Sequence, residues 1–127
     1  MVTGDILRHL APQDRAYFRA SREARFGMPL EAINEGRQAR REDFRKSLAP
    51  LRRTLGAQPY FGGDAPLYAD YALFGAFQWA RCVSEFELLA EDDPIHAWRE
   101  RLLDAFDGIA RAAPACGGGA HEDPTSR

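Results

Sequence analysis

Cysteine is scarce in this 127-residue chain, which contains only Cys82 and Cys116. Two cysteines cannot build the multi-bridge disulfide framework of a small secreted domain, and they do not form a CxxC zinc knuckle. The three histidines, His9, His96 and His121, are far apart in the sequence and have no partners at metal-ligand spacing. The sequence therefore predicts no metal site.

Long apolar runs are also missing. The longest near-unbroken stretch, residues 71–83, contains Gln78 and Arg81 and is shorter than the roughly 20 residues that cross a bilayer. At the N-terminus, Asp5 and Arg8 stand where a signal peptide would need an apolar run. We therefore expect no membrane segment and a cytoplasmic location.

Signatures of an autonomous enzyme are absent as well. None of the serines Ser21, Ser47 and Ser84 lies in a nucleophile-elbow pattern. The Gly62-Gly63 pair lacks the lysine and hydroxyl residue that complete a phosphate-binding loop. The sequence predicts no catalytic residue in this chain.

The composition is that of an ordinary globular protein, with 45% apolar residues, 28% charged residues and a net charge of -2. Residues 1–56 hold 12 basic and 7 acidic side chains, whereas residues 57–127 hold 5 basic and 12 acidic ones. The basic residues of the first part are interleaved with acidic ones, and no nucleic-acid-binding motif accompanies them. We therefore expect no nucleic-acid partner.

Helix punctuation recurs along the chain, and no stretch alternates apolar and polar residues with the period of two that a strand requires. The sequence predicts an all-α fold. Prolines favour the first turn of a helix and glycine favours the position after its last turn, and proline inside a helix breaks or kinks it. The expected helices are a short turn over residues 5–10, Pro12 to Gly27, Pro29 to about Leu55 with a kink or break at Pro50, residues 67–83, and Asp93-Pro94 to Pro114.

The segment 67–83 is apolar almost all the way round, so we expect a central helix shielded on every side, with Trp79 and Cys82 in the core. After Pro94, apolar residues recur at helical spacing and predict one amphipathic helix that also carries an Asp107–Arg111 ion pair. These residues are Ile95, Trp98, Leu102, Phe106 and Ile109. The fold would be a helical bundle over residues 1–114, and residues 115–127 would form a flexible tail.

The start of the central helix carries half of a capping box. Asp70 stands three residues after Leu67, so its carboxylate can accept a hydrogen bond from the Leu67 N–H, but Leu67 has no side-chain acceptor with which to reciprocate. Losing a Ser or Thr cap costs typically about 1 kcal/mol, so this helix start is predicted to be weaker than a complete box.

Residues 58–81 resemble the segment that introduces the core helix in the all-helical C-terminal domain of cytosolic glutathione transferases. The family pattern is an apolar residue, Gly, Asp, any residue, Pro, Ser or Thr, any residue, Ala and Asp. In this sequence the pattern falls on Phe61, Gly63, Asp64, Ala65, Pro66, Leu67, Tyr68, Ala69 and Asp70, with Leu67 departing from it. The likeness extends over about residues 5–114 and is greatest to bacterial enzymes of the β-etherase-like branch. It implies that Asp64, Leu67 and Asp70 have structural roles at the helix start.

The resemblance also implies what this chain contributes to function. In this family a separate thioredoxin-like domain holds glutathione, and we expect that domain to be absent here. The helical domain supplies a wall for the hydrophobic electrophile and half of a homodimer interface. By resemblance the wall would come from the first helix, with Tyr17 and Phe18 as the candidate residues. The alternative for these two residues is ordinary packing of that helix.

Two functions remain open at this point. The chain is either the C-terminal domain of a glutathione transferase, inactive on its own, or a free-standing helical module for protein association or apolar ligand binding. Exposed apolar surface around Tyr17 and Phe18 would favour the first, since a free-standing module is expected to have covered or paired that surface.

Overall fold

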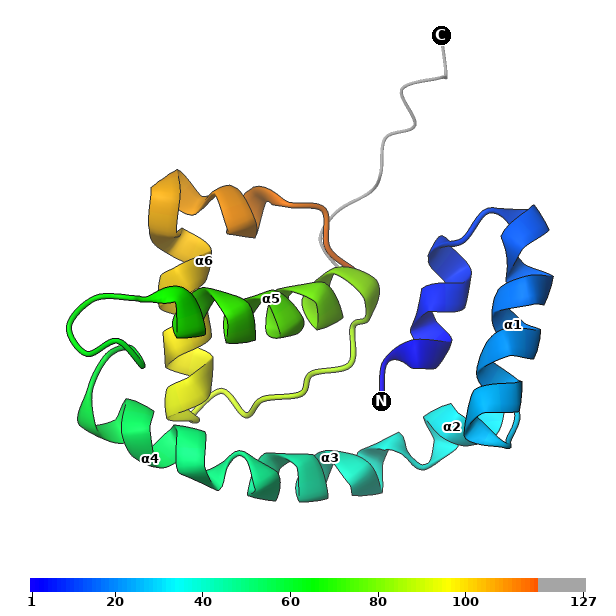
Figure 1. Ribbon diagram of the computed structural model, residues 1–127, viewed down its shortest axis with the longest axis horizontal. Coiled ribbons are helices and arrows are strands. Elements are labelled where there is room, and N and C mark those ends of the chain that lie inside the picture. Colours follow the sequence, from blue (N-terminus) through cyan, green and yellow to red (C-terminus); the bar gives the residue numbers. More distant parts are fainter. Residues whose placement is uncertain (117–127) are drawn as a thin grey trace, which may run out of the picture.

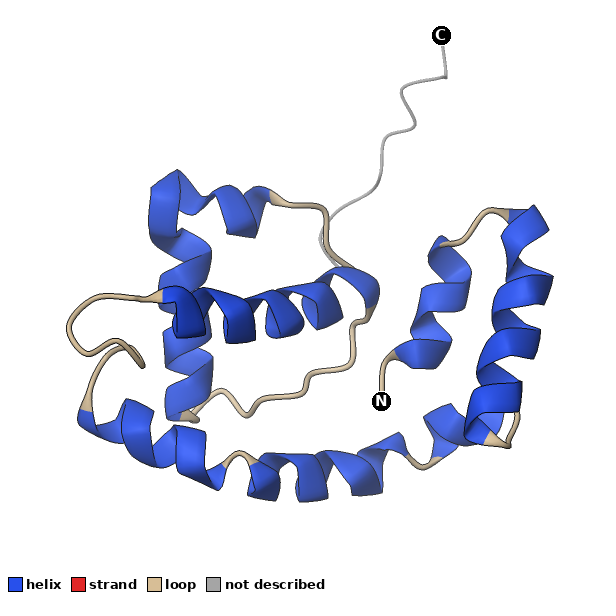
Figure 2. Cartoon of the chain, in the orientation of Figure 1, coloured by secondary structure: helices blue, strands red, loops and turns tan. Residues whose placement is uncertain are grey.

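The computed structural model describes residues 1–116, and these residues are helical with connecting loops (Figure 2). A flexible tail was expected over residues 115–127. Its residues 117–127, which include His121, lie outside the described residues. A short 3₁₀-helix, η1, precedes six α-helices, and the described part contains no strand. The elements are η1 (Thr3–His9), α1 (Pro12–Phe26), α2 (Leu30–Glu35), α3 (Arg37–Ser47), α4 (Ala49–Ala57), α5 (Tyr68–Val83) and α6 (Pro94–Ala112). The predicted all-α class is confirmed.

The ends of α1 follow the predicted signals. Pro12 occupies the first helical position, where its missing N–H removes no intrahelical hydrogen bond. Gly27 caps the other end with φ of 69°, a left-handed conformation that glycine adopts without steric cost, and its N–H donates to the Glu23 carbonyl at 2.8 Å. The chain therefore turns sharply after α1 and enters α2.

The single long helix expected from Pro29 to Leu55 is three helices laid end to end along one side of the molecule (Figure 1). The break near Pro50 is confirmed, because Leu48 caps both α3 and α4 and Pro50 lies in the first turn of α4. A second break at Gly36, between α2 and α3, was not expected. Glycine loses more backbone freedom in a helix than any other residue, so a helix is readily interrupted at Gly36.

The core forms around Trp98 of α6, whose side chain is completely buried. Three aromatic rings meet its indole edge to face, with centroids 5.5 Å away for Phe61, 6.4 Å for Phe74 and 6.1 Å for Phe77. Edge-to-face aromatic pairs contribute stability beyond the area they bury. The buried residues packed with them are Leu48, Leu55, Leu89, Ile95 and Leu102.

Helix α5 crosses α6 and also contacts η1, so it does lie at the centre of the fold (Figure 1). The expectation that it is shielded on every side is wrong, because only Asp70, Phe77 and Ala80 of this helix are buried. Trp79, expected in the core, is 50% exposed, and Cys82 is half-buried. In the part of the chain that the structure describes, the outer face of α5 has no helix packed against it.

Helix α6 begins as predicted, with Asp93 Oδ1 accepting a hydrogen bond from the Ile95 N–H at 2.9 Å. It does not continue as one amphipathic helix, because residues 105–108 leave helical geometry and three of them have positive φ. Phe106 and Ile109 consequently turn outward and are each 71% exposed, so their expected place in the core is wrong. Arg111 pairs with Asp104 at 2.6 Å and with Glu100 at 2.9 Å, in place of the expected pair with Asp107.

Two buried carboxylates join elements that are distant in the sequence. Asp5 of η1 accepts a hydrogen bond from Arg37 of α3 at 2.8 Å and another from the Ser84 hydroxyl. Asp93 accepts two from Arg52 of α4, at 2.7 and 3.0 Å, so the cap of α6 is tied to α4. Buried charges are stable only when paired and hydrogen-bonded, and both carboxylates meet that condition.

Candidate functional site

Asp70 has a fully buried side chain that accepts four hydrogen bonds. Its Oδ1 accepts from the Phe61 N–H at 2.8 Å and from the Trp98 indole N–H at 2.8 Å. Its Oδ2 accepts from the Gly62 N–H at 3.1 Å and from the Leu67 N–H at 3.0 Å. One carboxylate therefore connects the turn before α5, the first turn of α5 and the central tryptophan.

The charge of Asp70 is compatible with this burial because of its donors. Burial raises the pKa of the carboxyl group, but the hydrogen bonds from Leu67, Trp98, Phe61 and Gly62 outweigh that effect and hold its pKa below the ordinary value. This buried carboxylate is saturated with N–H donors and therefore fixes the turn and the start of α5.

Asp64 and Leu67 lie at the surface of the same turn. Leu67 is exposed and has extended backbone angles, φ -117° and ψ -176°, which are those of an N-cap residue. Asp64 is exposed, and within residues 1–116 its side chain accepts no hydrogen bond. Gly63 has φ of 99°, so this tight turn requires glycine at that position. The backbone N–H groups of this turn therefore donate to the side chain of Asp70 and not to that of Asp64.

The two residues suggested by the family resemblance, Tyr17 and Phe18, lie on α1. This helix has no buried residue, and Tyr17 is 79% exposed. Phe18 is half-buried, with the guanidinium of Arg22 5.0 Å from its ring centroid. Ordinary packing therefore does not account for Tyr17, whose ring is open to solvent.

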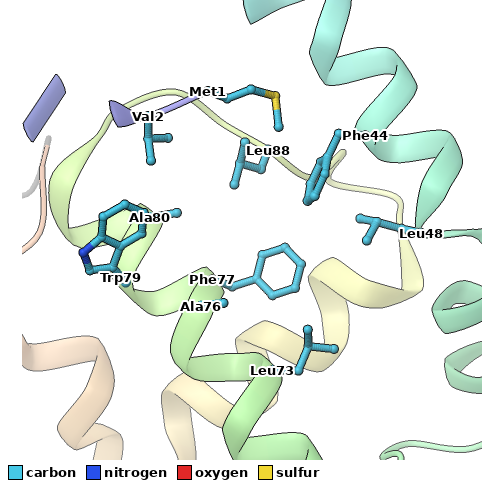
Figure 3. A pocket seen from close by; sticks show the side chains of 10 residues that line it. All are labelled: Met1, Val2, Phe44, Leu48, Leu73, Ala76, Phe77, Trp79, Ala80 and Leu88. Carbon is cyan, nitrogen blue, oxygen red and sulfur yellow. The ribbon is translucent and has the colours of Figure 1, made fainter. Parts of the chain in front are cut away.

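An apolar cavity of about 290 Å³ lies beside α5. Figure 3 shows its walls, which come from α3, α5, the segment between α5 and α6, and the N-terminal residues. Its lining residues are Met1, Val2, Phe44, Leu48, Leu73, Ala76, Phe77, Trp79, Ala80 and Leu88. Neither Tyr17 nor Phe18 is among them, so the cavity and the α1 face are separate features.

This cavity was not predicted from the sequence. Phe44 and Leu48 are apolar residues at helical spacing, and Phe77 and Trp79 belong to the segment 67–83 that was expected to form an apolar helix. No sequence signal distinguishes an apolar side chain that fills a core from one that borders a void, because the difference depends on how far apart the elements settle.

The remaining candidate residues do not form a reactive cluster. His9 Nε2 lies 3.0 Å from the Val83 carbonyl oxygen and 3.6 Å from Cys116 Sγ, and His96 lies 3.9 Å from Glu100. Among residues 1–116 no group of three or more histidine, cysteine or acidic side chains is arranged to hold a metal ion. None of the described helices combines the length and the apolar character needed to span a bilayer.

The helices and the Asp70-capped start of α5 define the described residues as an all-helical domain. A family profile described as "Glutathione S-transferase, C-terminal domain" matches residues 1–106. The chain therefore belongs to the glutathione S-transferase C-terminal domain family.

Curated relatives agree with this assignment. The chain is 32% identical over 93 residues to "Probable glutathione S-transferase parC" of Nicotiana tabacum, a match that covers 70% of this chain and 42% of that protein. It is 30% identical over 86 residues to "Glutathione S-transferase U25" of Arabidopsis thaliana, with 65% and 38% covered. The chain thus spans about two-fifths of the length of the curated relatives it matches.

Proposed function

We propose that this chain is the part of a glutathione transferase that binds the hydrophobic co-substrate, and that it is inactive alone. In the complete reaction the glutathione thiolate forms a sulfur–carbon bond with an electrophilic carbon, and the bond to the leaving group breaks. Residues outside 1–116, in a thioredoxin-like domain, would hold glutathione and lower the pKa of its thiol. Residues 1–114 would form the helical domain that positions the electrophile.

The observation that carries this proposal is the open aromatic face of α1. A helix of 15 residues without a single buried side chain contributes little to the core, and yet it presents Tyr17 to solvent. An exposed aromatic side chain offers a large, rigid apolar surface to a ligand or to another domain. Tyr17 and Phe18 would form the wall against which an apolar electrophile is held and from which water is excluded.

Further features of the complete protein belong to the same proposal. A homodimer, a cytoplasmic location and glutathione as the thiol substrate are expected from the family assignment. The relatives described above are plant proteins, and the bacterial, β-etherase-like branch stays a prediction.

A second function, protein association by a free-standing module, is favoured by one observation. Tyr71 of α5 and Phe106 of α6 have ring centroids 6.3 Å apart, and Phe106 is exposed together with its neighbour Ile109 and with Tyr68. The Tyr71–Phe106 pair is an exposed aromatic surface that a second molecule could cover.

Two measurements separate these functions. Calorimetric titration of the chain with reduced glutathione into the millimolar range is expected to give only heat of dilution, and saturable binding would refute the claim that glutathione is held elsewhere. Sedimentation at low micromolar concentration is expected to show a monomer under the first function. Self-association that persists there, and that is abolished by Phe106→Ser, would favour the association module.

A further inference from the structure

A separate, much smaller cavity lies between α5, the segment that runs back from α5 to α6, and the first half of α6 (Figure 1). Its volume is about 10 Å³, which is close to the room that one water molecule needs. Two arginines and one glutamate border it together with apolar side chains. The lining residues are Phe77, Ala80, Arg81, Phe86, Glu87, Leu88 and Arg99.

Arg99 of α6 is a buried cation whose carboxylate partners lie far away for charged groups. Its side chain is only 8% exposed, and its guanidinium lies 3.3 Å from a Glu87 oxygen and 3.4 Å from a Glu100 oxygen. Charge-assisted N–H···O bonds are normally shorter than this. The Nε of Arg99 is also buried, and within residues 1–116 it donates to no acceptor. The described side chains therefore compensate the charge of Arg99 only in part.

Arg81, near the end of α5, is compensated less well. Among residues 1–116 no carboxylate forms an ion pair with it, and its hydrogen bond to the Arg111 carbonyl oxygen is long, at 3.4 Å. Its Nη1 is buried and has no acceptor in the same part of the chain. An arginine in a protein does not deprotonate, so Arg81 cannot escape this cost by losing its charge. Two helices thus each bring an arginine with a buried, unsatisfied N–H group to one cavity.

The remaining walls strengthen the attraction of these arginines for an anion. An ion pair is stronger in apolar surroundings than in water, because the local dielectric constant is lower. The acidic side chain on the walls, that of Glu87, is 58% exposed, so much of its charge is screened by solvent. The apolar side chains are buried or half-buried; they are Phe77, Ala80, Phe86 and Leu88.

We propose that this cavity binds one chloride ion between the guanidinium groups of Arg81 and Arg99. The volume of about 10 Å³ excludes phosphate, sulfate and carboxylate groups, whereas a chloride ion is only slightly larger than a water molecule. Chloride accepts N–H groups from both arginines and also compensates the charge of Arg81, which water does not. The ion would connect α5 to the first half of α6. This site does not depend on glutathione and goes beyond the function proposed above.

The first test compares two anions of equal charge and different size. An ion that binds only the folded chain stabilises it by mass action. Urea unfolding is measured in sodium chloride and in sodium gluconate, each at about 0.5 M, since gluconate is much too large for the cavity. With a dissociation constant of about 0.25 M or less, chloride is expected to lower the unfolding equilibrium constant at least about threefold relative to gluconate. A smaller effect would mean that water fills the cavity and would overturn the proposal.

The second test locates the site on the chain. Arg81→Gln removes one of the two cations and is expected to abolish the difference between chloride and gluconate. Arg53→Gln is the matched control, since Arg53 is exposed on α4 and does not line the cavity, and it is expected to keep that difference. General effects of salt act on both variants alike. A chloride effect that survives Arg81→Gln, or that is lost in both variants, would refute the location.

A third test uses the glutamate on the cavity wall. Glu87 competes with an anion for Arg99, so Glu87→Gln is expected to tighten chloride binding at least about threefold. Binding is measured directly on the folded chain from the broadening of the chloride NMR signal, which requires no unfolding. The broadening is expected to increase in Glu87→Gln and to fall in Arg81→Gln. Equal broadening by the unmodified chain and both variants would contradict a site between Arg81 and Arg99.

Discussion

Replacing Asp70 by asparagine tests the role of its carboxylate without changing the size of the side chain. Each carboxylate oxygen accepts two hydrogen bonds, all from N–H donors and all within 3.1 Å. In asparagine one of the two oxygens becomes an NH₂ group, which is itself a donor. Whichever way the amide turns, two buried N–H groups then face a donor and lose their acceptor.

The expected cost follows from those two donors. A buried donor left without a partner costs about 1–3 kcal/mol, and hydrogen bonds to a neutral acceptor are weaker than those to a carboxylate. Allowing for some local relaxation, Asp70→Asn is expected to lower the free energy of unfolding by about 3–5 kcal/mol. Domains of this size have about 5–15 kcal/mol in total, so the variant should still fold in the cold but unfold at much lower denaturant.

The assay is urea unfolding followed by the fluorescence of Trp98, in a Trp79→Phe background that leaves a single tryptophan. Asp64→Asn is the control, because Asp64 belongs to the same turn but is exposed. It is expected to change the free energy of unfolding by less than about 0.5 kcal/mol. A loss below about 1 kcal/mol for Asp70→Asn would refute the argument that the four hydrogen bonds organise the start of α5.

Three further predictions use the same assay. The pKa of Asp70 is lower in the folded chain than its ordinary value of 3.8, so the stabilisation that its charge gives is present above that pH and is lost as the pH falls through the folded pKa. This loss of stability in acid should be smaller in Asp70→Asn. A pH profile of stability that is the same in both chains would contradict the role of the Asp70 charge. Leu67→Ser supplies the missing cap at an exposed position with suitable backbone angles, and should raise the free energy of unfolding by about 1 kcal/mol, whereas a decrease would show that the Leu67 side chain is needed. Arg52→Ala leaves the buried Asp93 carboxylate without its cation. Because Arg52 is one-third exposed and its charge is partly screened by solvent, the free energy of unfolding should fall by only about 1–2 kcal/mol. This loss should vanish in an Asp93→Asn background.

Helix boundaries governed by local chemistry could be predicted from the sequence. Pro12 and Pro94 start helices because their fixed φ suits the first turn, and Gly27 ends one because it adopts positive φ freely. The break at Pro50 and the hydrogen bond from Leu67 to Asp70 follow from the same kind of reasoning. In each case the determining atoms lie within a few residues of one another.

The turn inside α6 shows where periodicity misleads. Residues 95–109 keep apolar side chains at helical spacing, which predicts one continuous helix. The structure interrupts it at residues 105–108, where Asp107 and Gly108 have positive φ. An Asp-Gly pair is a recognised turn signal, and at Asp107-Gly108 this signal prevails over the apolar spacing.

The exposure of α5 could not be predicted, because it depends on which elements arrive to cover it. A helix apolar on all sides is normally enclosed by neighbours. Here α6 covers one side and η1 contacts another, while Trp79 and Ala76 remain open to solvent. The number of neighbours is a property of the whole fold, and the local sequence does not contain it.

The two exposed aromatic side chains Tyr17 and Trp79 lie in different surroundings. Tyr17 stands on a helix face with no enclosing wall, so it needs a second body, such as a domain or a ligand held by one, before it can bind anything tightly. Trp79 borders a concave site whose other walls are already supplied by this chain.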